Sequence, residues 1–307
     1  MGRRRVLGVV ACTVLTVGLA ISGPAHGRNA QSALHDNAVT VGSFDFAESK
    51  LLAEIYSQAL EGGGIKVRRA FDLGPRELVA PALAGGFLEL VPEYAGTAVQ
   101  FLSLAEVTPA ANTEETHRAL VRTLAGKRLT ALEPAPAQDA NTFAVSQATA
   151  DTYSLRALSD LTKAASILTF GGPPECKTRP LCLVGLRDVY GMKFKEFVEL
   201  DAGGPLTKQA LRDRVVDVAL LFSTDPAIGE GGFVELVDDR GLQPAENITP
   251  LVRTEAIDRF GPQLAARVDA VSSRLTTDVL RDLNGRVASG QRVAKVASRW
   301  LESEGQS

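Results

Sequence analysis

The sequence predicts an α/β protein made of two similar lobes, each a sheet flanked by helices. Three observations support this fold class. Segments with strand and helix periodicity alternate from residue 39, the alternation restarts after residue 137, and the two halves share one helix–strand unit. Alternating strands and helices are typical of parallel or mixed sheets that helices cover on both faces.

The first half is predicted to contain three strands and two helices. The strands are expected at 39–42, 65–71 and 88–91. Asp45 and Glu48 have the spacing of a capping box at the start of the first helix, and Gly62 is expected to end it. Pro75 is expected at the first position of the second helix, and Pro92 at the end of the third strand.

The second half begins after the proline- and alanine-rich segment 133–137. Strands are expected at 143–145, 167–170, 215–222 and 233–237, and helices at 155–165 and 206–212. The tail from 255 to 301 is predicted to be largely helical.

An internal similarity links the two halves. The segment LAGGFLELVPEY aligns without gaps with LRDRVVDVALLF, so Glu89 meets Asp217 and Tyr94 meets Phe222. Small ligands of open α/β sheets bind beyond the carboxyl ends of the strands. We therefore expect Tyr94 and Phe222 on opposite walls of a ligand cleft between the lobes, where ring faces attract a cation. Chance similarity of two helix–strand units is the alternative.

The first 27 residues have the pattern of a secretory signal peptide. Three arginines precede a short apolar run and a small-residue segment that ends near Gly27. The apolar run is short for a membrane-spanning helix. We expect an exported, periplasmic or otherwise extracytoplasmic protein that begins with a flexible polar segment at 28–38. An uncleaved anchor and lipidation at Cys12 are the alternatives.

Charge and motifs exclude two classes of function. Loss of the signal peptide changes the formal net charge from −3 to −6, and no basic stripe is present, so nucleic acid is not an expected partner. The sequence contains no G-x-S-x-G, P-loop or H-E-x-x-H motif. We therefore expect neither an enzyme nor a cofactor or metal site.

Cys176 and Cys182 lie close together in the segment PPECKTRPLC. Two neighbouring cysteines in an exported chain predict a disulfide, with two buried free thiols as the alternative. Closing so short a loop stabilises by about 2 kcal/mol in the chain-entropy model.

Four segments resemble the substrate-binding proteins of ABC importers for glycine betaine, choline and related osmoprotectants. They are VTVGSFDFAES, LVPEYAGTA, DANTFAVS and the stretch from TRPLCLVGLRD to LLFSTD, and the resemblance extends over residues 39–305. It implies a two-lobed periplasmic-binding-protein fold of type II, which closes on a small ligand by hinge motion. Residues 39–139 with 244–307 then form lobe 1 and 140–243 lobe 2. A membrane permease and an ATPase are the implied partners.

The resemblance also implies an aromatic cage for a quaternary ammonium group. Matched position by position, it assigns ligand contacts to Tyr94, Thr97, Phe143 and Phe222, and it matches Arg179 to an arginine that can hold a ligand carboxylate.

Two positions depart from the family pattern. Phe44 stands where the family often has lysine, and Glu246 stands where a further cage tyrosine is expected. These departures favour choline-like cations without a carboxylate, or larger amines, whereas Arg179 favours a carboxylate. A solvated loop residue is the alternative for Glu246. Alternative functions are binding of another small amine or amino-acid derivative, and a sensor module that does not transport.

Overall fold

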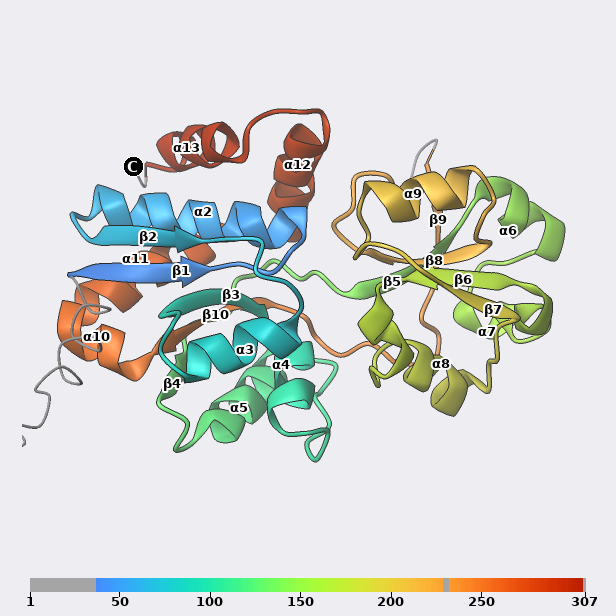
Figure 1. The fold of residues 1–307 in the computed structure, drawn as a ribbon, viewed down its shortest axis with the longest axis horizontal. Coiled ribbons are helices and arrows are strands. Elements are labelled where there is room, and N and C mark those ends of the chain that lie inside the picture. Colours follow the sequence, from blue (N-terminus) through green and yellow to red (C-terminus); the bar gives the residue numbers. More distant parts are fainter. Residues whose placement is uncertain (1–36, 229–231, 306–307) are drawn as a thin grey trace, which may run out of the picture. The chain divides into compact units, whose positions relative to one another are not determined.

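The structure is a computed structural model, and it describes residues 37–228 and 232–305 (Figure 1). The expected signal peptide lies outside the described residues, as does the expected flexible segment except for its last two positions. Within the described part of the chain, no helix combines the length and the apolar character needed to cross a bilayer.

Two five-stranded mixed sheets form the framework. The first has the order β2 (Lys66–Ala70), β1 (Ala38–Gly42), β3 (Leu90–Tyr94), β10 (Ile248–Arg253) and β4 (Leu129–Ala131). The second has the order β7 (Glu196–Glu199), β6 (Thr169–Gly172), β8 (Val218–Phe222), β5 (Asn141–Val145) and β9 (Val234–Leu236). In each sheet the first three strands are parallel, and the fourth is antiparallel to both of its neighbours. The predicted α/β architecture with two similar sheets is confirmed.

The helices that cover the first sheet come from both the N-terminal and the C-terminal parts of the described chain. They are α2 (Ala47–Gly62), α3 (Arg76–Ala84), α4 (Ala95–Leu102), α5 (Thr113–Leu124), α10 (Thr254–Phe260), α11 (Pro262–Ser272), α12 (Thr277–Ala288) and α13 (Val293–Ser303). Helix α2 packs against α11 and α13, on the side of the sheet opposite α3 (Figure 1). One continuous hydrophobic core joins these elements, so the helical tail predicted from the sequence belongs to the first sheet.

The second sheet has smaller helices. They are α6 (Gln147–Tyr153), α7 (Leu158–Leu161), α8 (Leu183–Tyr190) and α9 (Pro205–Arg212), with 3-10 turns at Ala165–Ile167 and Pro174–Lys177. Helices α8 and α9 lie on opposite faces of the sheet (Figure 1). Two separate hydrophobic clusters, one on each face, form the core.

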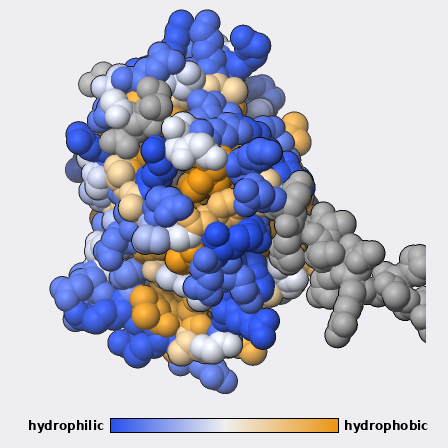
Figure 2. All heavy atoms as spheres, turned by 90° about the vertical axis from the view of Figure 1, so that its left-hand side faces the viewer, coloured by the Kyte–Doolittle hydropathy of each residue, from blue (hydrophilic) through white to orange (hydrophobic). Residues whose placement is uncertain are grey.

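The surface of the molecule on the side of the first sheet, which Figure 2 shows, is mostly hydrophilic. In Figure 2 its apolar side chains gather in patches that charged groups interrupt. Scattered exposed apolar groups are normal on protein surfaces, so the informative polar groups of this fold are the buried ones described below.

The start of α2 differs from the predicted capping box. Phe46 is the N-cap and makes no side-chain cap bond, and Asp45 is exposed. Glu48 is buried instead, because its carboxylate accepts hydrogen bonds from the side chains of Tyr94 and Thr224. The prediction that the helix ends at Gly62 is confirmed.

The third strand does not end at Pro92. Strand β3 continues to Tyr94, and Pro92 lies directly opposite Pro250 in the antiparallel pair with β10. Alternate pairs of an antiparallel ladder exchange no hydrogen bonds, so two prolines can face each other there. Strand β1, on the other side, pairs with β3 at Leu90 and ends at Gly42. The missing N–H of Pro92 therefore breaks no ladder bond.

Other boundaries shift in the second half. The helix predicted at 155–165 is wrong: α6 ends at Tyr153, its C-cap Ser154 has left-handed backbone angles, and only the short α7 follows. The Asp160 carboxylate accepts hydrogen bonds from two backbone N–H groups just before α7, which fixes its late start. In the first half, Pro75 is the N-cap of α3 rather than its first residue.

The internal similarity has a structural basis. Glu89 Oε2 accepts a hydrogen bond from the Thr40 backbone N–H at 3.0 Å, and Asp217 Oδ2 accepts one from the Thr169 N–H at 2.8 Å. The same backbone bonds flank both carboxylates, from the Glu89 N–H to Thr40 and from the Asp217 N–H to Thr169. Each acidic residue thus joins the start of its own strand, β3 or β8, to the neighbouring parallel strand, β1 or β6.

Candidate ligand-binding pocket

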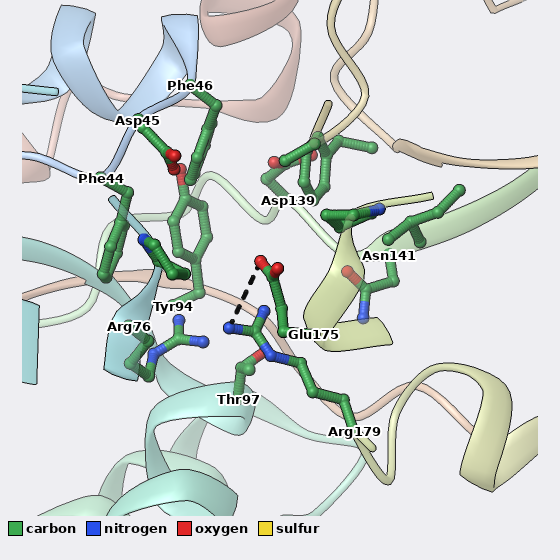
Figure 3. Close-up of a pocket in the computed structure, with 15 residues that line it drawn as sticks. Phe44, Asp45, Phe46, Arg76, Tyr94, Thr97, Asp139, Asn141, Glu175 and Arg179 are labelled. Carbon is green, nitrogen blue, oxygen red and sulfur yellow. Dashed lines mark ion pairs between the residues drawn. The ribbon is translucent and has the colours of Figure 1, made fainter. Parts of the chain in front are cut away.

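A pocket lies at the carboxyl ends of strands from both sheets (Figure 3). The first-sheet side contributes Phe44, Asp45, Phe46, Pro75, Arg76, Tyr94 and Thr97; the other lining residues are Asp139, Asn141, Pro173, Glu175, Arg179, Ala202, Leu220 and Phe222. Five of the seven residues proposed from the sequence are among them. This is the place at which open α/β sheets bind small ligands.

Four aromatic rings line the pocket. Phe46 is central: its ring centroid lies 5.9 Å from those of Phe44 and Tyr94 and 5.3 Å from that of Phe222. Phe46 and Phe222 are close to parallel, with 25° between their planes. Because Phe222 comes from the second sheet and the other three rings come from the first, the pocket holds aromatic faces from both halves.

Tyr94 is held rigidly at the tip of β3. Its hydroxyl donates a hydrogen bond of 2.9 Å to Glu48, and the side chain is 5% exposed. Burial, followed by the charge of Glu48, raises the pKa of Tyr94 well above its ordinary value. The phenol therefore stays neutral and presents a ring face rather than a charge.

Behind Tyr94 lies a buried polar cluster. Glu48 accepts hydrogen bonds from Thr224 and Asn284, and Thr224 also bonds to Asp139 at 2.8 Å. Burial raises the pKa of Glu48, and burial together with the Glu48 charge raises the pKa of Asp139 well above its usual range. Each of the two carboxyls consequently holds its proton more tightly than an isolated carboxyl in water would.

Arg76 approaches the pocket from the start of α3. Its Nε and Nη2 donate to the Glu93 carboxylate at 3.0 and 2.8 Å, and its Cζ lies 5.1 Å from the centre of the Phe44 ring. Arg76 and Glu93 are both buried. The attraction of Glu93 opposes the desolvation of Arg76, whose pKa stays above its ordinary value, so the guanidinium is charged.

Arg179 approaches from the second half of the chain. Its Nη2 donates to Glu77 at 2.9 Å and lies 3.7 Å from Glu175. The predicted disulfide between Cys176 and Cys182 is present: Arg179 lies within the loop that it closes, and Glu175 directly precedes that loop.

Glu246 does not line the pocket. It is 1% exposed and sits behind Thr97, whose backbone N–H donates to Oε2 at 3.0 Å and whose hydroxyl donates to Oε1. The structure therefore departs from both sequence interpretations, a carboxylate in the cage and a solvated loop residue. Burial raises the pKa of Glu246 to about 7, against the lowering effect of the hydrogen bonds from Thr97.

Gly96 allows the segment that carries Glu246 to come this close. A Cβ at Gly96 would meet the Pro244 ring at 2.3 Å and the Ala245 carbonyl at 3.0 Å. The Thr97 N–H belongs to the first turn of α4, so the Glu246 carboxylate caps this helix from a distant part of the chain.

Phe143 is also absent from the pocket lining. It is 1% exposed and packs on Phe170 in the core of the second sheet, with ring centroids 5.9 Å apart. Asn141, two residues earlier on the same strand, lines the pocket instead. Side chains two residues apart share a face of the strand, so Phe143 differs from Asn141 in its depth: it lies further along β5 from the end that the ligand site uses, within the core.

Sequence reasoning missed Phe46, Arg76, Asp139 and Glu175. Phe46 and Arg76 had a usable signal, because each lies in the loop or first helical turn after a strand of the first sheet. Asp139 and Glu175 had no comparable signal in the sequence. Asp139 lies in a segment that crosses between the sheets, and Glu175 lies directly before the disulfide loop.

Two sheets of one topology that share a pocket of rings and guanidinium groups define a two-lobed solute-binding protein. The chain belongs to the family described as the substrate binding domain of ABC-type glycine betaine transport systems, whose model matches residues 37–303. It is therefore a substrate-binding component of an ABC importer, which works with permease and ATPase components. The family consists of transport proteins rather than enzymes.

Individual relatives agree with this assignment. The chain is 29% identical over 278 residues to the glycine betaine-binding protein YehZ of Escherichia coli strain K12, covering 87% of this chain and 90% of the relative. It is 25% identical over 279 residues to the ergothioneine transport permease/ergothioneine binding protein EgtU of Helicobacter pylori strain G27, covering 90% of this chain and 49% of that protein.

Solved structures agree on the fold. A glycine betaine/carnitine/choline ABC transporter structure superposes with a TM-score of 0.68 at 23% identity, over 87% of this chain and 99% of the other. The unliganded YehZ structure gives a TM-score of 0.62 at 27% identity, over 89% of this chain and 100% of the other.

Proposed function

We propose that this protein captures a small quaternary-ammonium solute outside the cytoplasm and presents it to the importer's permease. The observation that supports the proposal most directly is the set of four rings in one pocket, with Phe46 and Phe222 only 5.3 Å apart. Ring faces attract a desolvated cation by up to about 2 kcal/mol each. The family and the glycine betaine-binding relative support the same ligand class.

Capture involves closure of two lobes, 39–139 with 244–307 and 140–243. The chain passes between the sheets twice, and the two crossing segments pair with each other: the Asp139 N–H donates to the Glu246 carbonyl at 3.0 Å, and Gln138 bridges Asn247. Few residues connect the sheets there, so changes of backbone angles near 139–141 and 240–246 can move one lobe relative to the other. Phe222 then moves with its lobe relative to the first-sheet rings, so that the rings can enclose the ligand.

The ligand contacts that this proposal assigns are Phe44, Phe46, Tyr94, Thr97, Arg179 and Phe222, all of which line the pocket. Glu246 acts through Thr97 rather than by touching the ligand. Export through the predicted signal peptide places the protein where the disulfide of its pocket wall is stable.

Titration calorimetry of the mature protein tests the ligand class. Glycine betaine, choline, carnitine and ergothioneine are the probes. At least one trimethylammonium compound is expected to bind, and Phe46→Ala should weaken that binding about tenfold or more, because a central ring is lost. Tyr153→Ala is the matched control, since Tyr153 is an exposed ring outside the pocket. If none of the four compounds binds at millimolar concentration, the ligand class is wrong.

A further inference from the structure

We propose that Glu48, Asp139 and Thr224 form a lock between the two lobes, and that this lobe lock takes up one proton when the lobes close on a ligand. The inference rests on the proposed function, because it assumes that the lobes close around a ligand. It goes further by identifying Glu48 as a positioning residue and by coupling ligand capture to proton uptake. Glu48 is not among the residues that line the pocket, so its effect on the ligand passes through its partners.

The lobe lock connects side chains that belong to different sheets. Glu48 lies in the first turn of α2, whose apolar residues pack in the core of the first sheet. Thr224 follows the end of β8 in the second sheet, two residues after Phe222. The Thr224 hydroxyl donates a hydrogen bond to Glu48 Oε2, and Asn284 of α12 donates another to the same oxygen. If the lobes separate, the tip of β8 leaves α2, so the bond between Thr224 and Glu48 exists only in the closed form.

Glu48 also connects the two aromatic walls of the pocket. Its other oxygen, Oε1, accepts the hydrogen bond from the Tyr94 hydroxyl at 2.9 Å. Glu48 therefore holds the ring at the tip of β3 through Oε1, and it holds the segment that follows Phe222 through Oε2 and Thr224. One carboxyl group thus fixes rings of opposite walls relative to each other, which is the task of a positioning residue.

The centre of the lobe lock has too few hydrogen atoms for two ionised carboxylates. Thr224 Oγ1 lies within hydrogen-bond distance of Glu48 Oε2 and also of Asp139 Oδ1, the latter at 2.8 Å. A hydroxyl has one hydrogen and can donate to only one of these oxygens, whereas ionised carboxylates only accept. A proton on one of the carboxyls supplies the missing donor, because that carboxyl can then donate to the Thr224 oxygen.

Asp139 has a second oxygen that lacks a partner. Oδ2 is buried and has no hydrogen-bond partner among the described residues, whereas Oδ1 also accepts the Thr224 backbone N–H at 3.0 Å. A buried charged oxygen without a partner is costly, and a proton on the carboxyl removes the charge. Burial, followed by the charge of Glu48, raises the pKa of Asp139 well above its ordinary value, and burial raises the pKa of Glu48. Both directions agree with a proton held in the closed form.

No cation neutralises this pair of carboxyls. Each arginine or lysine on the surrounding elements is paired with another carboxylate: Arg76 with Glu93, Lys208 with Asp225 and Arg281 with Asp278. Among the described residues, no ion pair involves Glu48 or Asp139. Two neighbouring buried carboxyls without a cation ionise together only at a high cost. The titratable and charged groups on the elements around the pair are Asp45, Arg76, Glu93, Tyr94, Lys208, Asp225, Glu246, Asp278 and Arg281.

The direction of the pH effect follows from this burial. In the open form water reaches both carboxyls, and their pKa values return toward the ordinary ones. In the closed form both pKa values are raised, so closure takes up a proton and is favoured as the pH falls. As the pH rises through the raised values, affinity should weaken by at most about tenfold per pH unit for one proton. The ligand does not displace this proton, because Asp139 Oδ1 is bonded to Thr224 and Oδ2 is buried.

Titration calorimetry in two buffers of different ionisation enthalpy counts the protons taken up for each ligand bound. Choline and glycine betaine are the probes, since neither gains or loses a proton between about pH 6 and pH 9. We expect the wild type to take up as much as about one proton per ligand and to bind more weakly as the pH rises. Glu48→Gln should abolish the uptake and flatten the pH profile, because the amide supplies the missing donor and leaves Asp139 free to ionise.

Two further comparisons separate the lobe lock from general effects of substitution. Asp269→Asn is the matched control, because it removes a partly buried carboxyl of raised pKa on α11, outside the lock, and should keep the uptake. Thr224→Ser keeps the hydroxyl and should behave like the wild type. Thr224→Val keeps both carboxyls but removes their bridge, so it should lower affinity about fivefold or more and reduce the uptake. This variant gives the same readout if Glu48→Gln does not fold.

Binding without a change in protonation overturns the lobe lock and leaves the ligand class intact. Release of protons on binding, or uptake that persists in a folded Glu48→Gln protein, has the same consequence. If neither probe binds, the proposed ligand class fails, and small-angle scattering of the ligand-free protein decides on the lock separately. A radius of gyration that increases with pH in the wild type but not in Glu48→Gln supports the lock. Equal changes in both proteins, or no change in the wild type, overturn it.

Discussion

The two sheets have the same strand order and the same acidic link between strands, but they differ at the tips that meet the pocket. The order β2-β1-β3-β10-β4 corresponds strand by strand to β7-β6-β8-β5-β9. After the aromatic residue at each tip, the first half has Gly96 and Thr97 whereas the second has Thr224 and Asp225. The framework is repeated and the polar contacts at the tips are not.

Each tip is tied to a different partner. Gly96 leaves room for the crossing segment, so that Glu246 can reach Thr97. Thr224 instead reaches across to Glu48 beside Tyr94, and Asp225 forms an ion pair with Lys208 at 2.8 Å. Among the described residues, one tip therefore holds the buried carboxyl of Glu246 with no cation in direct contact, and the other holds the carboxylate of Asp225 paired with Lys208. The comparison indicates that specialisation of this fold lies in the residues just after each strand, not in the strand itself.

The largest expected effect concerns Glu246 and pH. Its pKa is raised from 4.5 to about 7 by burial, so the folded state binds this proton more tightly than the unfolded state. The associated stability is fully present below pH 4.5 and is lost as the pH rises through about 7. Relative to Glu246→Gln, the wild type should lose roughly 2.5 kcal/mol of unfolding free energy between pH 5 and pH 8. Chemical denaturation of the ligand-free proteins across this range measures the difference.

Asp225→Asn is the matched control at the other tip. Asp225 has a cation in contact, so its neutralisation should destabilise the protein near neutral pH instead of relieving a penalty. Glu48 and Asp139 are present in both the wild type and Glu246→Gln, so their contributions to the pH dependence of stability cancel in the difference. Parallel stability curves for the wild type and Glu246→Gln would show that Glu246 does not titrate in this interval.

The strands and helices were predicted from the sequence more accurately than the side-chain contacts at the strand tips, for a physical reason. Strand and helix periodicity is local, so the strands of the two sheets were expected within a few residues, apart from β4 and β10 of the first sheet and β7 of the second. Partners such as Glu48 with Thr224, or Thr97 with Glu246, are distant in sequence and carry no periodic signal. The predicted capping box shows this difference. Local spacing assigned the Glu48 side chain to the start of its own helix, whereas its carboxylate accepts hydrogen bonds from the distant residues Tyr94 and Thr224.

The site followed the same rule. Tyr94 and Phe222 were found because each ends a strand of a repeated unit, and both line the pocket. Phe143 was matched through a motif, and its place further along β5 than Asn141 puts its ring in the core. Arg76 was missed because its pairing partner Glu93 and its ring contact Phe44 lie on two other elements.

The next effect compares the two tip residues as ligand contacts. Tyr94→Ala should lower affinity for the best quaternary amine about thirtyfold, because it removes a cation–π contact of up to about 2 kcal/mol. Phe222→Ala should cost less, about tenfold, since that ring is half-buried and is not anchored by a hydroxyl bond such as the one from Tyr94 to Glu48. Tyr94→Phe keeps the ring face and should stay within about threefold of the wild type. Calorimetry on the three variants decides, and a Tyr94→Ala protein that binds as tightly as the wild type would reduce Tyr94 to a packing residue.

The smallest effect tests the repeated acidic link itself. Glu89 and Asp217 accept equivalent backbone hydrogen bonds, but Glu89 is 4% exposed and also pairs with Arg259 at 2.7 Å, whereas Asp217 is half-buried. Glu89→Gln should therefore cost about 1–2 kcal/mol of unfolding free energy, because a buried charge-assisted bond is weakened.

Asp217→Asn keeps an oxygen that can accept the Thr169 N–H, and water can reach the site, so its cost should stay below about 1 kcal/mol. Urea unfolding of both variants at one pH gives the two values. Equal costs would mean that the contribution of this hydrogen bond to the unfolding free energy depends on the position in the repeated unit and not on the burial of the side chain. In that case the two halves would be energetically as well as topologically equivalent at this joint, and the asymmetry of the molecule would begin only at the strand tips.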